Sequence, residues 1–131
     1  MTDALSDPPP ATVETKLILA SRVEHTPVFN KHGERIGHIA DLSIDRVSGE
    51  VVYAILSFGG FLGIGQRFHP LPWRMLTYDP AQGGYVVALE RQVLADAPHY
   101  DADELRELGG PSYPGYGRVV DYYGPFGGPL I

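Results

Sequence analysis

The chain has 131 residues, which is enough for one domain with flanking segments and too short for two ordinary domains. Its 16 glycines and 12 prolines favour turns and short strands over a helical bundle. Cysteine is absent, which excludes disulfides, thiolate zinc sites and cysteine nucleophiles. The net charge of −6 arises in two acidic segments, residues 1 to 16 and Asp96 to Glu107, and no basic stripe is present. We therefore expect no nucleic acid partner.

Residues 1 to 16 are predicted to form a disordered N-terminal arm. The arm is acidic and poor in apolar residues, and Pro8-Pro9-Pro10 supports only extended or polyproline geometry. It lacks the basic start and apolar core of a secretory signal, and no later apolar run approaches membrane-spanning length. We expect a soluble, cytoplasmic protein with no membrane partner.

Residues 17 to 97 are predicted to form the folded domain, beginning at Leu17. Ala20 to Val23 has the length of one helical turn, with Ser21 as its expected cap. Asn30-Lys31-His32-Gly33 and Val47-Ser48-Gly49 have the residue types of hairpin turns. Between them the pattern has period two, with Gly37 at an expected bulge. The alternation places Ala40, Leu42 and Ile44 on one side and Asp41, Ser43 and Asp45 on the other.

The stretch from Val51 to Phe58 is the most apolar strand of the sequence. Both of its faces are apolar, so both need cover. Val52, Ala54, Leu56 and Phe58 lie on one face, and Val51, Tyr53 and Ile55 lie on the other. One face meets the core of a small barrel. The second is covered either by the chain's own tail or by a second copy of the protein.

The loop that follows, Gly59 to Gly65, places Phe61, Leu62 and Ile64 among four glycines. Such a loop either caps its own core or forms a contact surface. It lacks the Lys-Ser/Thr ending of a phosphate-binding loop, and the prolines after it prevent a helix from starting there. Nucleotide binding is therefore not expected, and we prefer the contact surface.

The rest of the domain is read as short strands, followed by a different kind of segment. Gln66 to Leu71 suits a sheet edge because Pro70 and Pro72 remove backbone donors, and Trp73 to Tyr78 and Tyr85 to Leu89 complete the strands. A short helix is expected over Arg91 to Ala97. Residues 98 to 131 are predicted as another short helix and a Gly/Pro-rich tail that docks through its aromatics. Those aromatics are Tyr113, Tyr116, Tyr122, Tyr123 and Phe126.

Catalytic chemistry has little support in the sequence. His32 and His38 flank a hairpin strand that also carries Asp41, which makes them the candidate for a weak metal site; solvated hairpin residues are the alternative. His69, between Phe68 and Pro70, is expected to be a buried, hydrogen-bonded imidazole. No nucleophile elbow accompanies the Ser, His and Asp residues. We assign no catalytic, metal or cofactor-binding residues and predict that the protein is not an enzyme.

Four segments together resemble the PRC-barrel family, which is found in the photosynthetic reaction centre H subunit and in a ribosome maturation factor. The segments are ASRVEHTPVFNKHGERIGHIADLSID, SGEVVYAILSFGGFLGIG, FHPLPW and DPAQGGYVV, in that order. The resemblance covers roughly Leu17 to Ala97, and the second segment looks like the central hairpin and loop of the stand-alone bacterial members, which implies a bacterial protein. It implies an all-β, SH3-like barrel of about six strands that serves as an interaction or assembly module. The membrane helix of the H subunit and the additional domain of the maturation factor are not matched.

Two functional hypotheses follow. The first is a module that self-associates, as a homodimer, through the face of Val51, Tyr53 and Ile55, the loop of Phe61, Leu62 and Ile64, or both. The second is an adaptor that binds another protein through its aromatic tail. RNA- or ribosome-associated action ranks below both because the charge balance is acidic.

Overall fold

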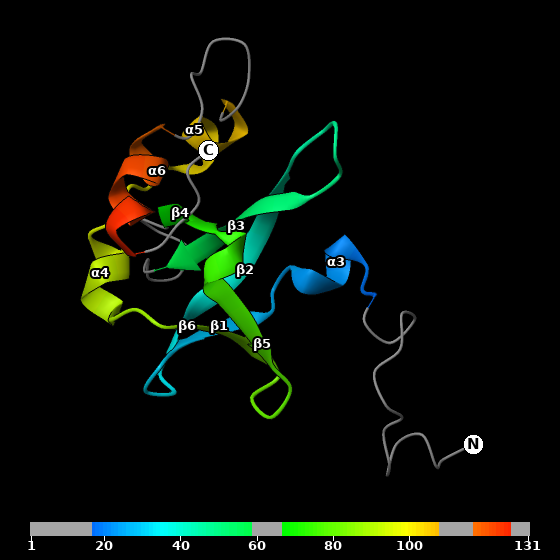
Figure 1. Cartoon of the computed structure of the whole chain (residues 1–131). Coiled ribbons are helices and arrows are strands. Elements are labelled where there is room, and N and C mark those ends of the chain that lie inside the picture. Colours follow the sequence, from blue (N-terminus) through cyan, green and yellow to red (C-terminus); the bar gives the residue numbers. More distant parts are fainter. Residues whose placement is uncertain (1–16, 59–66, 108–116, 127–131) are drawn as a thin grey trace.

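The computed structural model describes residues 17–58, 67–107 and 117–126. These residues form one six-stranded sheet that curls into a half-barrel (Figure 1). The strand order is β4-β3-β2-β1-β6-β5; β1 and β6 are parallel and all other neighbours are antiparallel. The strands are β1 (Pro27–Asn30), β2 (Arg35–Ile44), β3 (Val51–Phe58), β4 (Arg67–Pro72), β5 (Leu76–Asp79) and β6 (Gly84–Val87). The expected all-β barrel fold is confirmed.

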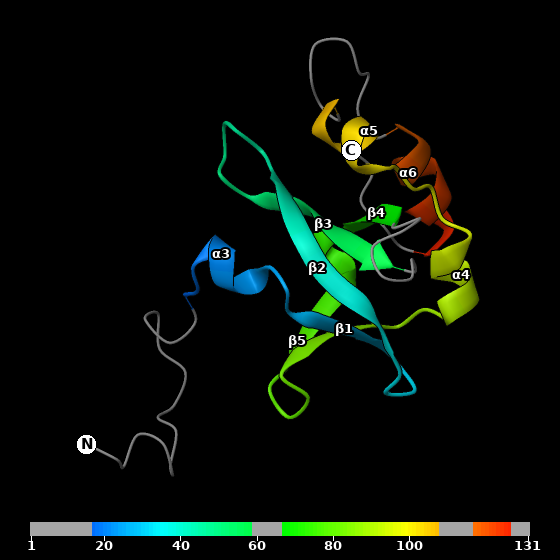
Figure 2. The same cartoon turned by 180° about the vertical axis from the view of Figure 1, so that it is seen from behind.

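The helices are short and lie on two sides of the sheet. They are α3 (Ala20–Val23), η1 (Trp73–Met75), α4 (Arg91–Ala95), α5 (Ala102–Glu107), α6 (Gly117–Tyr123) and η2 (Gly124–Phe126). In both views α4, α5 and α6 gather on one side, whereas α3 lies on the opposite side (Figures 1 and 2). Helices α5 and α6 pack against β4.

Both predicted hairpins are present, and each has a glycine in the left-handed region that other residues rarely adopt. Gly33 and Gly49 each have φ of 80°. In the first turn the side-chain oxygen of Asn30 accepts hydrogen bonds from the backbone nitrogens of His32 (2.9 Å) and Glu34 (3.0 Å). The turn residues therefore fix both hairpins locally.

Gly37 lies at an irregular point of the sheet, as its type predicts. The register of β1 and β2 shifts between Val28 and Phe29, whose partners are Gly37 and Arg35. A β-carbon on Gly37 would overlap the carbonyl oxygen of Ser57 on β3. Only glycine therefore allows β3 to approach this closely.

Three local expectations are wrong. The cap of α3 is Leu19, without a side-chain hydrogen bond, and not Ser21. Two irregularities in the pairing of β2 with β3, between Ile39 and Asp41 and between Ser43 and Ile44, break the alternation, and Ile44 is half exposed. Trp73 begins the helical turn η1, because the chain must bend there to pass from β4 to β5.

The core joins the sheet and the C-terminal helices. Every residue of β3 from Tyr53 to Phe58 is buried, so both faces of this strand are covered as expected. Val119 and Tyr123 of α6 are fully buried in the same apolar cluster as Tyr53 and Leu56. The cover for the second face therefore lies within a single chain.

The two edges of the sheet differ. Phe68 of β4 exchanges two backbone hydrogen bonds with Tyr100, at 3.0 and 2.9 Å, and Pro70 and Pro72 remove further donors. This confirms that the segment around Pro70 is an edge strand. Strand β5 forms the other edge.

Candidate interaction surfaces

The predicted outer face of β3 lies largely inside the molecule. Tyr53 and Ile55 are 2% and 3% exposed, and Val51, at the start of the strand, is partly buried. Of these three predicted contact residues, only Val51 is accessible. A homodimer built on Tyr53 and Ile55 would require the segments of the chain that bury these two side chains to move.

The described part of the aromatic tail docks on its own barrel. The Tyr122 hydroxyl donates a 2.6 Å hydrogen bond to the carbonyl of Val93, next to the fully buried Tyr123. Burial raises the pKa of both hydroxyls, with the neighbouring Asp96 and Tyr122 adding to the effect at Tyr122 and Tyr123 respectively. Phe126 is the exposed member, 6.0 Å from the Tyr122 ring.

Five of the predicted contact residues lie outside the described residues. They are Phe61, Leu62 and Ile64 of the glycine loop and Tyr113 and Tyr116 of the tail. Their role as a contact surface stays a prediction.

Two groups of exposed apolar residues, which we call together the apolar end, were not assigned from the sequence. It consists of Leu17, Ile18, Leu19, Ile44 and Val47, whose exposed fractions lie between 50% and 96%. Ile44 and Val47 lie at the end of the β2–β3 hairpin. Leu17, Ile18 and Leu19 directly precede α3. Both elements lie on the side away from α4 and α6 (Figures 1 and 2). The sequence feature that indicates this surface is Val47, an apolar residue in a turn.

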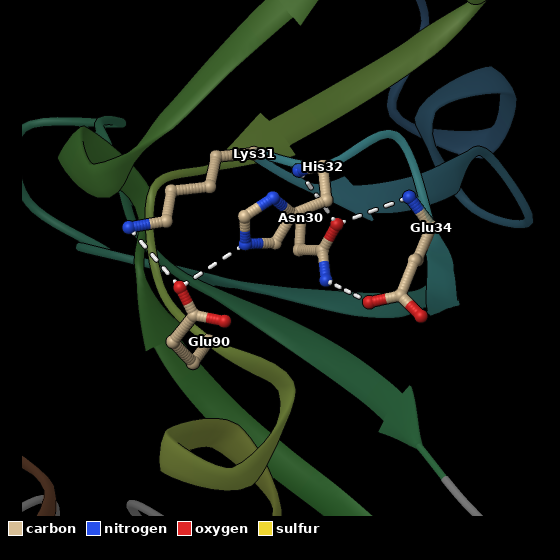
Figure 3. A network of polar contacts seen from close by, with 5 residues as sticks. All are labelled: Asn30, Lys31, His32, Glu34 and Glu90. Carbon is tan, nitrogen blue, oxygen red and sulfur yellow. Dashed lines mark hydrogen bonds and ion pairs between the residues drawn. The ribbon is translucent and has the colours of Figure 1, made fainter.

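A polar network links the first hairpin turn to the segment before α4 (Figure 3). The carboxylate of Glu90 lies 3.1 Å from the Lys31 ammonium and 3.2 Å from His32 Nε2. These contacts, led by the Lys31 hydrogen bond, lower the pKa of Glu90. All three side chains are about half exposed, so the network contributes little to stability.

The candidate metal site is not assembled. His32 faces Glu90, whereas His38 stacks on His25 with ring centroids 6.0 Å apart. Partial burial, His25 and Arg35 together lower the pKa of His38. Within residues 17–58, 67–107 and 117–126, no three His, Asp or Glu side chains are grouped as metal ligands.

His69 is fully buried, as expected, and its ring packs against two other rings. Its ring lies 5.6 Å from the Phe58 ring, edge-on, and 5.4 Å from the His99 ring. Neither ring nitrogen has a well-formed hydrogen bond to the described part of the chain. Burial, followed by His99 and Arg67, lowers the pKa of His69 to about 4, against a smaller opposite effect of the Pro98 backbone. The ring is therefore neutral at pH 7 and acts as a packing group.

Comparison with protein-family models gives a match to the PRC-barrel domain over residues 16–92, which is more than half of the chain. The chain belongs to the PRC-barrel family. A search of curated proteins gives no match. The matched region contains all six strands of the PRC barrel, and helices α5 and α6 lie after it.

PRC-barrel domains are interaction modules that are typically non-catalytic. Among the described residues of this PRC barrel, no helix is both long enough and apolar enough to cross a membrane. Its accessible features are apolar surfaces and an exposed ion-pair network, and both suit contact with another protein.

Proposed function

We propose that this PRC barrel is a non-catalytic assembly module that self-associates, as a homodimer, through the apolar end. The observation that supports this is the exposure of five aliphatic side chains on one side of the domain: Leu17, Ile18, Leu19, Ile44 and Val47. Exposed apolar groups that gather on one side of a domain are typical of interaction sites.

Burial of these side chains supplies the driving force. A Val, Leu or Ile contributes about 1.5–3 kcal/mol when it is fully buried. Several such residues from each of two copies offset an association cost of roughly 4–15 kcal/mol. The pair of Ile44 and Val51 across the hairpin extends the surface onto β3, so one residue of the predicted strand face remains part of it.

The test is the molar mass of the full chain by light scattering over a dilution series. The wild type is expected to dimerise, and Ile44→Asp with Val47→Asp is expected to shift it to monomer. Phe126→Ser is the matched control, since Phe126 is also about half exposed but follows α6 on the opposite side. A wild type that is monomeric at high micromolar concentration would refute self-association.

The adaptor hypothesis rests on the other tail aromatics, Tyr113, Tyr116 and Phe126, because Tyr122 and Tyr123 are used within the fold. The cytoplasmic location and the bacterial origin stay predictions from the sequence.

A further inference from the structure

The concave side of the half-barrel is incompletely covered at β5. Tyr78 pairs with Tyr85 of β6, and directly paired residues project from the same face of a sheet. Tyr85 belongs to the core cluster and is 9% exposed, yet Tyr78 is 52% exposed. A ring on the core-facing side of the sheet is thus left in contact with solvent.

Tyr78 is the first of three neighbouring aromatic rings, which also include Tyr85 and Trp73. The Tyr78 and Tyr85 centroids are 5.2 Å apart, and the Tyr85 and Trp73 centroids are 5.3 Å apart. Trp73 is partly buried against the core, and Arg74 beside it is exposed. We call Trp73, Tyr85 and Tyr78 the aromatic row.

Neighbouring aromatic rings at a protein surface suit a polyproline II segment. Proline rings pack against them, and the preformed extended helix loses little conformational entropy on binding. The exposed guanidinium of Arg74 adds a preference for an acidic segment.

The chain's own N-terminal arm has this chemistry. Pro8-Pro9-Pro10 follows Asp7 directly, and residues 1 to 16 carry three acidic side chains against Lys16. Leu17 lies seven positions after Pro10, which corresponds to about 22 Å in polyproline geometry. This length exceeds the radius of gyration of a 100-residue domain, which is about 13 Å.

The place where the arm joins the domain also suits docking on the aromatic row. In both views α3 lies between the β2–β3 hairpin and β5, on the side away from α4 and α6 (Figures 1 and 2). Because the arm is attached to the domain, its effective concentration reaches the millimolar range, so weak contacts suffice.

We propose that the aromatic row is a docking site for an acidic polyproline II segment and that Pro8-Pro9-Pro10 of the same chain occupies it. The docked arm covers Tyr78 and part of Trp73. The inference is independent of self-association, which concerns the apolar end.

Trp73 is the sole tryptophan of the chain, so its fluorescence tests the proposal directly. In the full chain, replacing Pro8, Pro9 and Pro10 by Ala is expected to shift the emission to longer wavelength and to raise the acrylamide quenching constant. Ser6→Ala with Thr12→Ala is the matched control in the arm and should leave both unchanged. A synthetic peptide of residues 1–16, added at millimolar concentration to the triple proline variant, should reverse the shift.

A double-mutant comparison identifies the site. In the Tyr78→Ser background, the three proline substitutions should cause little further change, because the docking surface is already lost. An undiminished effect in that background would overturn the aromatic row as the site. No effect of the proline substitutions in the wild type would overturn docking altogether.

Fluorescence over a dilution series shows whether the arm of the same chain or that of a second copy occupies the aromatic row. Docking within one chain leaves the Trp73 emission independent of protein concentration. Emission that shifts on dilution, in parallel with the molar mass, would indicate the arm of a second copy and overturn docking within one chain.

Discussion

The hydroxyl of Tyr122 donates a 2.6 Å hydrogen bond to the backbone carbonyl of Val93 and so fastens α6 to α4. The two residues are 29 positions apart in the sequence. This bond holds the end of the described tail beside the barrel, with Tyr123 fully buried next to it.

Tyr122→Phe is expected to lower the free energy of unfolding by about 1 kcal/mol, since one partly buried hydrogen bond is lost. Urea denaturation measures this change. Tyr78→Phe removes a hydroxyl from an exposed ring and should change stability by less than about 0.5 kcal/mol. Equal effects of the two substitutions would contradict the importance of the Val93 bond.

Gly37→Ala is expected to destabilise the fold by about 2 kcal/mol or more, because the new methyl group overlaps the Ser57 carbonyl. Gly117→Ala is the control, since nothing lies within 4 Å of its β-carbon position at the start of α6. Thermal unfolding of both variants gives the comparison. A neutral Gly37→Ala would contradict the close approach of β2 and β3 at Gly37.

His25 has φ of 72°, in the left-handed region, where it supports the turn between α3 and β1. His25→Gly removes the backbone strain and is expected to be more stable than His25→Ala by roughly 1 kcal/mol. Both variants lose the stacking on His38, so their difference isolates the backbone effect. Chemical denaturation of the pair measures it; a less stable glycine variant would exclude strain at this position.

His69 makes stability depend on pH. Its pKa is about 4 in the folded protein and 6.5 as the ordinary value, so between these values the unfolded chain binds a proton that the folded chain does not. Its contribution is complete above pH 6.5 and is lost as the pH falls towards 4. The loss is at most about 3 kcal/mol, at about 1.4 kcal/mol per pKa unit.

His69→Leu keeps the apolar packing and removes the titrating group. Urea unfolding at pH 7, 5.5 and 4.5 should show a smaller loss of stability on acidification for this variant than for the wild type. Leu71→Ile is the control, because it alters packing at another fully buried position and removes no titrating group, so the pH dependence should be unchanged. Identical slopes for His69→Leu and the wild type would exclude His69 as the cause.

Much of the sheet was predictable because its signals are local. Asn30 and Gly33 mark the first hairpin, Gly49 marks the second, and Pro70 marks an edge strand. The error in the alternation of β2 also has a local cause. The irregularity after Ile39 changes which residues face inward, and no residue type in the sequence indicates it. The candidate metal site is not formed, although His32 and His38 are close in sequence. His32 faces Glu90, whereas His38 stacks on His25.

The sequence by itself determined the family, the strands and the need to cover both faces of Val51 to Phe58, because turn chemistry and apolar alternation act over a few residues. Only the tertiary structure decided that the C-terminal helix α6 shares the core of the sheet. Val119 and Tyr123 lie more than 60 residues after β3 along the chain, and their docking depends on packing between distant elements that no local pattern encodes. In the folded chain Tyr53 and Ile55 are buried, whereas Ile44, Val47 and Tyr78 are exposed.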